Sequence, residues 1–409
     1  MTLPGQYCGR AEFDYCIVTG DRAQEVLLPP LFPMGSQHRR SSNHLCCFSG
    51  IGGFASGIAD VVGRDGYFLA VDSCSTALAC LKLREPRMHT CNAFIEDTSW
   101  WAKAIHHNFS GLSASPPCPP FSGLGYQRGE DDPRAKSWPY LLLLIALVKP
   151  VHLALENVIN IASASDFVAR VVEVITQLGY VVNTRIIDAD LFVPTKRARW
   201  FLLGVRTDCA APDASYVLRS GVAWDRPLVC VQDCISLNDE GPCARQAGLS
   251  KEMRAKYADP NLLPWKCYPR ILNGVQVAPT VLRSYGHAHE FCPSYLFTHG
   301  GLHGFCVRID KILRFATAAE VAALMGYGDC DSAIWQRLSM QTRWWQGLGD
   351  SVVPLVGSFV WGLLGAASIC PVTQRRGGGD PCDVVWRLML VHKKANSRRH
   401  AALNPDVFL

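Results

Sequence analysis

The sequence predicts an α/β protein with a doubly wound, mostly parallel β-sheet and a second, smaller, irregular domain. Between residues 44 and 206, short apolar runs alternate with segments of helical period, which is typical of such a sheet. A glycine-rich turn joins the first apolar run to the first helical segment. The alternation stops between residues 207 and 310, where prolines and glycines interrupt short apolar pieces, and this change predicts the second domain.

The composition fits an intracellular protein with a large core. The chain has 409 residues, of which 49% are hydrophobic, enough for more than one domain. Its 18 cysteines are scattered without a C-x-x-C pair, and no signal-peptide pattern is seen at the start. We therefore expect free thiols, no metal site, and a location in the nucleus if the source is eukaryotic or otherwise in the cytoplasm. The net charge of +5 points weakly to an anionic partner.

The first strand, turn and helix predict a ligand site. Residues 44–48 are an apolar run, and the glycine turn that follows leads into a helix reaching about Val62. Glycines let the backbone approach a ligand at a helix N-terminus, although the G-x-G-G spacing here is not the G-x-G-x-x-G pyrophosphate fingerprint. Asp72 ends the next strand, residues 67–71, where it could accept hydrogen bonds from ribose hydroxyls or simply be solvated.

A stiff loop presents a cysteine. Four prolines flank Cys118 within residues 113–125, so the backbone has few conformations there. Nucleophilic catalysis needs a thiolate held in one place. A buried structural cysteine in a turn is the alternative.

The next units bring a carboxyl group and two guanidinium groups to the same sheet. Residues 137–148 predict a helix capped by Ser137, and residues 151–155 predict a buried strand followed by Glu156. Ligands of such sheets lie at the carboxyl ends of strands, so Cys118 and Glu156 are expected to face one crevice. After a helix at 166–178 and a strand at 180–187, Arg197 and Arg199 open the strand at 200–205. Residues two apart share a strand face, and this pair suits a phosphate or a carboxylate unless it is an exposed strand end.

The remaining segments predict the outer parts of the molecule. Residues 251–283 carry a local surplus of Lys and Arg, which favours nucleic-acid binding in the central domain. Thr317 and Glu320 form a capping box for a helix reaching Met325. Asp350 and Ser351 could cap the uncharged run at 351–372, which we expect to be a buried core helix rather than a membrane span. Residues 1–43 are an extension, and residues 371–409 a basic, partly disordered tail.

In this order, six pieces resemble the cytosine-5 DNA methyltransferase family: the turn from Phe48 to Gly53, the Pro-Pro-Cys loop, Glu156-Asn157-Val158, Arg197-Ala198-Arg199, residues 314–320, and residues 349–352. The resemblance covers residues 44–206 and 311–365. It implies a Rossmann-like methyltransferase fold in residues 44–206, completed by 311–370, with residues 207–310 as the target-recognition domain. It also implies a monomer that acts on double-stranded DNA and needs no membrane.

The resemblance assigns roles to individual residues. Cys118 would attack the 6-carbon of a flipped cytosine, Glu156 would hold its ring nitrogen and amino group, and Arg199, supported by Arg197, would lie near the target base and its phosphate. S-adenosylmethionine would be held by Phe48, Gly50, Ile51, Gly52, Gly53, Asp72, Asn92, Pro117, Ser351 and Val352. It carries no phosphate, which agrees with a turn unlike the pyrophosphate type. DNA contacts are expected at Ser122, Arg270, Arg283 and Tyr285.

The sequence departs from the family pattern in places, and other functions stay open. Pro119 and Thr195 each replace a glutamine, and Asp350 replaces an asparagine. The transfer-RNA branch of the family usually has threonine at the position of Ser122, and its recognition signature is not found. A DNA-binding relative without catalysis, and a nicotinamide oxidoreductase suggested by the glycine turn alone, are the remaining alternatives.

Overall fold

The computed structural model describes residues 43–122, 129–219, 234, 270–272, 277–278, 280–281, 295–298, 313–315, 318–327 and 344–369. The predicted extension except Asn43, the predicted tail and most of the predicted target-recognition domain lie outside these residues. Thr317 lies outside them too, so the capping box stays a prediction, while the helix that it would begin is present.

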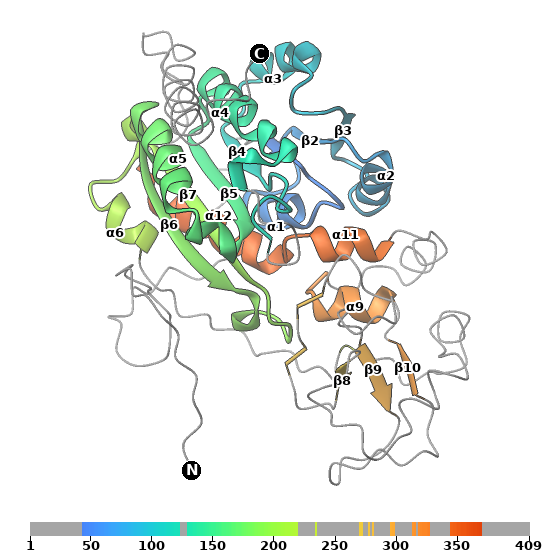
Figure 1. Ribbon diagram of the computed structural model, residues 1–409. Helices are drawn as coiled ribbons and strands as arrows, with labels where there is room; N and C mark the ends of the chain where they lie inside the picture. Colours follow the sequence, from blue (N-terminus) through green and yellow to red (C-terminus); the bar gives the residue numbers. More distant parts are fainter. Residues whose placement is uncertain are drawn as a thin grey trace, which may run out of the picture.

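A seven-stranded sheet forms the centre of the molecule, in the order β3-β2-β1-β4-β5-β7-β6 (Figure 1). Its strands are β1 (His44–Cys47), β2 (Phe68–Asp72), β3 (His89–Asn92), β4 (Gly111–Ala114), β5 (His152–Val158), β6 (Tyr180–Asp188) and β7 (Ala198–Arg206). Neighbouring strands are parallel except that β7 runs antiparallel to both β5 and β6. The predicted doubly wound, mostly parallel sheet is confirmed.

Helices cover both faces of this sheet (Figure 1). One core includes residues of α1 (Gly53–Val62), α2 (Ser75–Arg84), α6 (Ala214–Arg219), α9 (Ala318–Leu324) and α12 (Pro354–Ala366). The other includes residues of α3 (Trp101–His106), α4 (Ser137–Val148) and α5 (Ser165–Gln177). In β1, Leu45 and Cys47 belong to one core and Cys46 to the other, as the alternation of a strand requires. A strand covered on both sides is a continuous apolar run, which is why residues 44–48 were recognisable.

The remaining elements are short. The 3₁₀ helices are η1 (Thr98–Trp100), η2 (Gly129–Asp131), η3 (Pro133–Lys136), η4 (Ile159–Ser163), η5 (Ala189–Leu191) and η6 (Thr207–Cys209), and α11 (Trp344–Asp350) precedes α12. A second, three-stranded sheet of β8 (Arg270–Leu272), β9 (Tyr295–Thr298) and β10 (Leu313–Phe315) lies beyond α9 and α11 from the large sheet (Figure 1). The helical cover of the large sheet continues past residue 206, because Arg185 of β6 donates a hydrogen bond to the Leu218 carbonyl of α6.

Helix α4 has the bounds that the sequence predicts, but its start differs. It ends at Val148, and the next residue, Lys149, adopts the left-handed conformation just before Pro150. Ser137 does not cap it: the chain enters through η3, and the Ser137 hydroxyl donates to the Arg134 carbonyl. Asp132 is the capping residue instead, since it accepts from the Arg134 backbone N–H before the 3₁₀ turn.

Helix α12 is a core helix that packs on α1. A Cβ atom at Gly57 would overlap the Pro354 carbonyl, and the Ser358 hydroxyl donates to the Gly57 carbonyl at 2.9 Å. Gln346–Ala366 is long and apolar enough to cross a membrane, but 72% of it is buried inside the protein, as expected for a core helix. The predicted caps are wrong: α12 follows Val353 without a side-chain cap and begins at Pro354, while Asp350 ends α11. Proline needs no N–H at that first position.

Candidate active site

The Cys118 loop leaves the carboxyl end of β4 and is fixed by the neighbouring strand. Asn157 of β5 donates its side-chain amide to the Pro116 carbonyl at 3.0 Å. The backbone N–H groups of Phe121 and Ser122 both donate to the Cys118 carbonyl, at 3.0 and 2.9 Å. Cys118 is half-buried. The prolines therefore limit the loop, and hydrogen bonds on both sides of Cys118 set where its thiol lies.

Glu156 lies beside this loop, inside β5 rather than just after it. Its side chain is 6% exposed, and the Arg199 Nε atom lies 3.2 Å from its carboxylate. The pairing of Ala114 with Leu155 places the next residues along, Ser115 and Glu156, beside one another. The Ser115 hydroxyl hydrogen-bonds the Glu156 carboxylate. The Cys118 loop and Glu156 thus come from neighbouring strand ends, while a crevice between them stays a prediction.

The electrostatic surroundings raise the pKa of both catalytic candidates. Burial raises the pKa of the Cys118 thiol, and the charges of Glu156 and Asp350 add to the rise, against Arg199 and Arg197. Burial also raises the pKa of Glu156, while Arg199 and Arg197 oppose this. The carboxyl group is therefore suited to carry a proton that it can give to a bound substrate.

The two predicted arginines have different partners. Arg199 forms an ion pair with Glu156, which fits the expectation of a carboxylate partner. Arg197 precedes β7, is 3% exposed, and donates to the backbone carbonyls of Val281 at 3.0 Å and Gly349 at 2.8 Å. Burial, then the neighbouring Arg199, lowers the pKa of Arg197 to about 9, so it stays charged at neutral pH. Arg197 thus links two segments of backbone, whereas Arg199 pairs with the carboxylate of Glu156.

The glycine turn and Asp72 lie at the same edge of the sheet. Phe48, Gly50 and Gly52 all have positive φ angles, so the chain turns sharply after β1. The Asp72 carboxylate accepts hydrogen bonds from the backbone N–H groups of Gly50 and Cys74, each at 2.8 Å. A carboxylate has further lone pairs, so Asp72 can still accept from a ligand's hydroxyl groups.

This turn fits the S-adenosylmethionine that the sequence predicts. The buried Ser49 hydroxyl makes no hydrogen bond, and a Cβ atom at Gly50 would meet open space. A Cβ atom at Gly53 would overlap the Val352 carbonyl, so glycine there lets residues 351–352 lie against the start of α1. A free hydroxyl, an acidic side chain and open space beside backbone suit a nucleoside.

The remaining predicted residues lie on β3, in the glycine turn, in the Cys118 loop and in the central domain. Asn92 pairs in register with Asp72, but its amide donates to the Asp72 backbone carbonyl. Pro117 lies next to Cys118 in the loop, and Ser122 is half-buried there. Ile51 packs against Gly347, where a Cβ atom would crowd it. Arg270 begins β8, its side chain lies outside the described part of the chain, and Arg283 and Tyr285 lie wholly outside it. The predicted DNA contacts therefore stay predictions.

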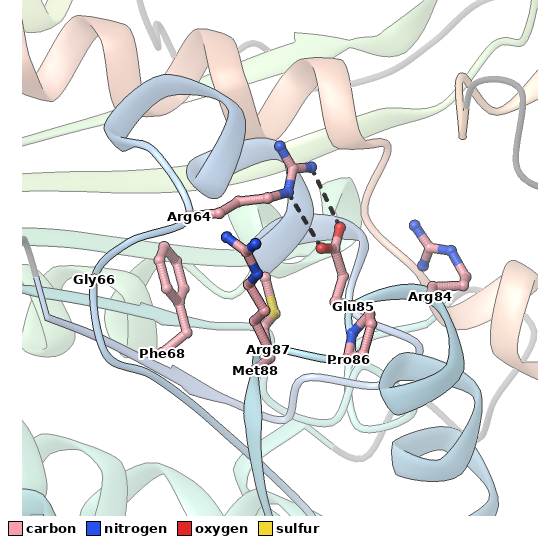
Figure 2. A pocket seen from close by; sticks show the side chains of 8 residues that line it. All are labelled: Arg64, Gly66, Phe68, Arg84, Glu85, Pro86, Arg87 and Met88. Atoms are coloured by element: carbon pink, nitrogen blue, oxygen red, sulfur yellow. Dashed lines mark hydrogen bonds and ion pairs between the residues drawn. The ribbon is translucent and has the colours of Figure 1, made fainter.

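A surface pocket lies away from these residues. It measures about 250 Å³ and lies where the chain enters β2 and β3, at the amino ends of those strands (Figure 2). Arg64 forms an ion pair there with Glu85, and the Phe68 ring lines the pocket (Figure 2). Cys118, Glu156 and Asp72 lie at the opposite, carboxyl ends. This pocket holds none of the predicted site residues, so the converging chemical groups, not the pocket, indicate the candidate site.

Sequence reasoning missed three residues that hold the site together. Ser115 could have been found by pairing β4 with β5, because it lies one position beyond Ala114. Tyr327 and Arg84 have no local sequence signal. The Tyr327 hydroxyl hydrogen-bonds the Ser351 hydroxyl, and the Arg84 guanidinium lies 4.3 Å from the centre of the Tyr327 ring.

Known proteins share this fold. The Entamoeba histolytica methyltransferase EhMeth superposes with a TM-score of 0.63 at 18% identity, covering 80% of this chain and 98% of that one. The Schizosaccharomyces pombe Dnmt2 methyltransferase gives 0.58 at 18% identity, covering 79% and 98%. At this level of identity the likeness shows the fold alone.

Sequence comparison adds the family. The type II methyltransferase M.PspPI of Psychrobacter sp. is 27% identical over 179 residues, 43% of this chain and 42% of that protein. The Mus musculus tRNA (cytosine(38)-C(5))-methyltransferase is 27% identical over 159 residues, 38% of each. The chain thus spans about two fifths of the length of these curated relatives. The sequence model of the C-5 cytosine-specific DNA methylase family matches residues 45–219, which supports the predicted family and its methyl donor, S-adenosylmethionine.

Proposed function

We propose that this protein is a DNA (cytosine-5)-methyltransferase that forms a covalent adduct between Cys118 and a flipped cytosine. One observation carries the proposal: a half-buried thiol and a buried carboxyl group, close enough for the carboxylate charge to raise the pKa of the thiol, come from neighbouring strand ends at the same sheet edge as the turn suited to a nucleoside. A ring nitrogen and an electrophilic ring carbon of one pyrimidine can be reached together from such a pair.

The residues supply a balanced sequence of bond changes. The Cys118 thiol gives its proton to solvent water and its sulfur forms a bond to the 6-carbon, while Glu156 gives its proton to the ring nitrogen. The 5-carbon thereby becomes nucleophilic. When bound, S-adenosylmethionine supplies the electrophilic methyl group that the 5-carbon takes up. S-adenosylhomocysteine would be the leaving group. Transfer of the 5-carbon proton to solvent water then breaks the carbon–sulfur bond and expels the Cys118 thiolate. The ring nitrogen returns its proton to Glu156, which, with reprotonation of the thiolate by solvent, restores the free protein.

The raised pKa values fit these roles. Glu156 must arrive protonated, and its burial favours that form. Arg199 holds the carboxyl group in place through its Nε atom. When Glu156 gives up its proton, its negative charge raises the pKa of the Cys118 thiol. The positive charges of Arg199 and Arg197 lower that pKa and so favour the nucleophilic thiolate.

DNA is the proposed substrate because the matching family model is a DNA methylase and the bacterial relative is a type II methyltransferase. The second candidate is transfer RNA, which the mouse relative's name specifies for that protein. Ser122, where the transfer-RNA branch usually has threonine, favours DNA.

Transfer of a labelled methyl group separates these candidates. The wild-type protein is incubated with labelled S-adenosylmethionine and either mixed-sequence duplex DNA or transfer RNA. Incorporation into DNA that drops more than about a thousandfold in Cys118→Ala, with S-adenosylmethionine binding kept, supports the proposal. Cys91→Ala, a half-buried thiol on edge strand β3, serves as the matched control. Label in transfer RNA alone would transfer the proposal to RNA, and an active Cys118→Ala would refute the covalent step.

A further inference from the structure

We propose that Thr195 and Arg197 are positioning residues that join the central segment, described at residues 277–278 and 280–281, to the cofactor-side segment at residues 349–352. Together they form a backbone clamp, defined as Thr195, Arg197 and the carbonyls that they hold. The inference rests on the proposed function, because it concerns the affinity of the same site for S-adenosylmethionine. Thr195 stands where the family that the sequence resembles usually has glutamine.

Thr195 is completely buried and holds two segments. Its hydroxyl donates to the Leu324 carbonyl at 2.8 Å. Leu324 ends α9, and the last carbonyls of a helix have no partner inside the helix. Thr195 also forms a β-bridge to Ala278, and the Lys196 N–H donates to the Ala278 carbonyl at 2.8 Å. The central segment is therefore attached just before β7.

Arg197 adds a second pair of attachments. Its terminal nitrogens donate to the carbonyls of Val281 and Gly349, and its own N–H donates to the Asp188 side chain at 2.7 Å. A planar guanidinium fixes the angle between the groups that it binds. The central segment and the end of α11 are thus held on one side chain, two residues from Arg199.

From the clamp, contacts continue to the glycine turn. Tyr327 follows Leu324 by three residues, and Ser351 follows Gly349 by two. The hydroxyl groups of Tyr327 and Ser351 form a hydrogen bond with each other. Arg84 covers the Tyr327 ring and donates to the Ile51 carbonyl at 2.7 Å. Two attachments of the clamp, at Leu324 and Gly349, therefore lie within a few residues of groups beside the predicted cofactor site.

Removing one hydroxyl tests the clamp. In Thr195→Val the Leu324 carbonyl loses its partner without a loss of volume, and water has no access to replace it. Thr195→Ser keeps the hydroxyl. Thr176→Val is the matched control, because Thr176 makes the same type of bond, to the Val172 carbonyl at 2.8 Å, on the surface of α5.

Affinity for S-adenosylmethionine is measured by calorimetric titration of the full chain, together with hydrogen exchange of residues 277–281. We expect Thr195→Val to bind about five- to tenfold more weakly and to exchange faster at 277–281, while Thr195→Ser and Thr176→Val stay near wild type. Equal affinity and protection in wild type and Thr195→Val would overturn the clamp, as would equal losses in the Val and Ser variants. A wild-type protein that binds no S-adenosylmethionine would instead refute the proposed function.

Discussion

The two edges of the seven-stranded sheet bury ionisable side chains in opposite ways. At the carboxyl edge, Glu156, Arg197 and Arg199 lie together, and each changes the electrostatics of Cys118. At the amino end of β1 and β5, His44 and His152 lie around the Trp361 ring. Each histidine bonds a serine hydroxyl, Ser113 at 2.9 Å and Ser368 at 2.8 Å.

The difference lies in what burial does to charge. Burial, then the neighbouring histidine, lowers the pKa of His44 to about 3, and burial, then Arg206, lowers that of His152 to about 4. Both rings are therefore neutral at pH 7, and a neutral ring bonded to a hydroxyl needs no counter-charge. The carboxyl edge instead keeps opposite charges next to each other, which is costly for stability and useful for moving protons.

The largest expected effect comes from breaking the charged edge. Glu156→Gln keeps the shape and a hydrogen-bonding group but has no proton to give, so kcat for methyl transfer should fall about 10²–10⁴-fold. Cys118 should at the same time alkylate faster with iodoacetamide, because Glu156 helps to raise its pKa. Single-turnover transfer and alkylation rates measure both, with Glu173→Gln on α5 as control. Activity within tenfold of wild type would show that Glu156 is not the acid.

Acid should destabilise the protein through the two buried histidines at the amino edge of the sheet. Above pH 6.5 both histidines are neutral in the folded and the unfolded chain, so they contribute no pH dependence. As the pH falls below 6.5, the two histidines bind protons in the unfolded chain but not in the folded chain. The free energy of unfolding therefore decreases with falling pH until the pH reaches the folded pKa values of about 3 and 4. Between pH 7.5 and 5 the loss is about 2 kcal/mol per histidine.

Urea unfolding at these two pH values checks this. The doubly substituted His44→Gln, His152→Gln protein, which keeps a hydrogen-bonding group at each position, should lose roughly 4 kcal/mol less than wild type over the same interval. An equal pH dependence in the two proteins would mean that the histidines are not buried as neutral rings.

The smallest expected effect comes from Ser115, which hydrogen-bonds Glu156 at the carboxyl edge of the sheet. Ser115 donates to Glu156 and so lowers its pKa, and Ser115→Ala should raise that pKa and carry the alkaline limb of kcat/KM to higher pH. The rate on that limb should change about two- to fivefold, with little effect at low pH. Ser137→Ala, which loses a hydroxyl bond at the start of α4, is the control. A limb that moves to lower pH contradicts the assignment.

Sequence patterns predicted what depends on neighbouring residues. The bounds of α4 follow from an apolar run ended by Pro150, and the approach of Cys118 to Glu156 follows from two consecutive parallel strands. The reversed direction of β7 between β5 and β6 left no mark in its own sequence, because a strand buried on both faces looks alike in either direction.

Residues that act across long separations were the least predictable. Arg197 was expected beside Arg199 on one strand face, and its partners at Val281 and Gly349 depend on how distant segments return to the sheet. The expected caps at Ser137, Asp350 and Ser351 failed because helices need not use every cap-competent residue near their start. In α12 the proline at its first turn took that place.

The contact between α1 and α12 bears on when this domain can fold during translation. The strands of the large sheet are complete at Arg206, but α12 begins only at Pro354. At 5–20 residues per second, the ribosome needs on the order of ten seconds to add that stretch. Until then the face that α12 covers, including Phe201 and Leu203, has only part of its partners. We therefore expect the nascent chain to expose this apolar face until its final core helix has been synthesised.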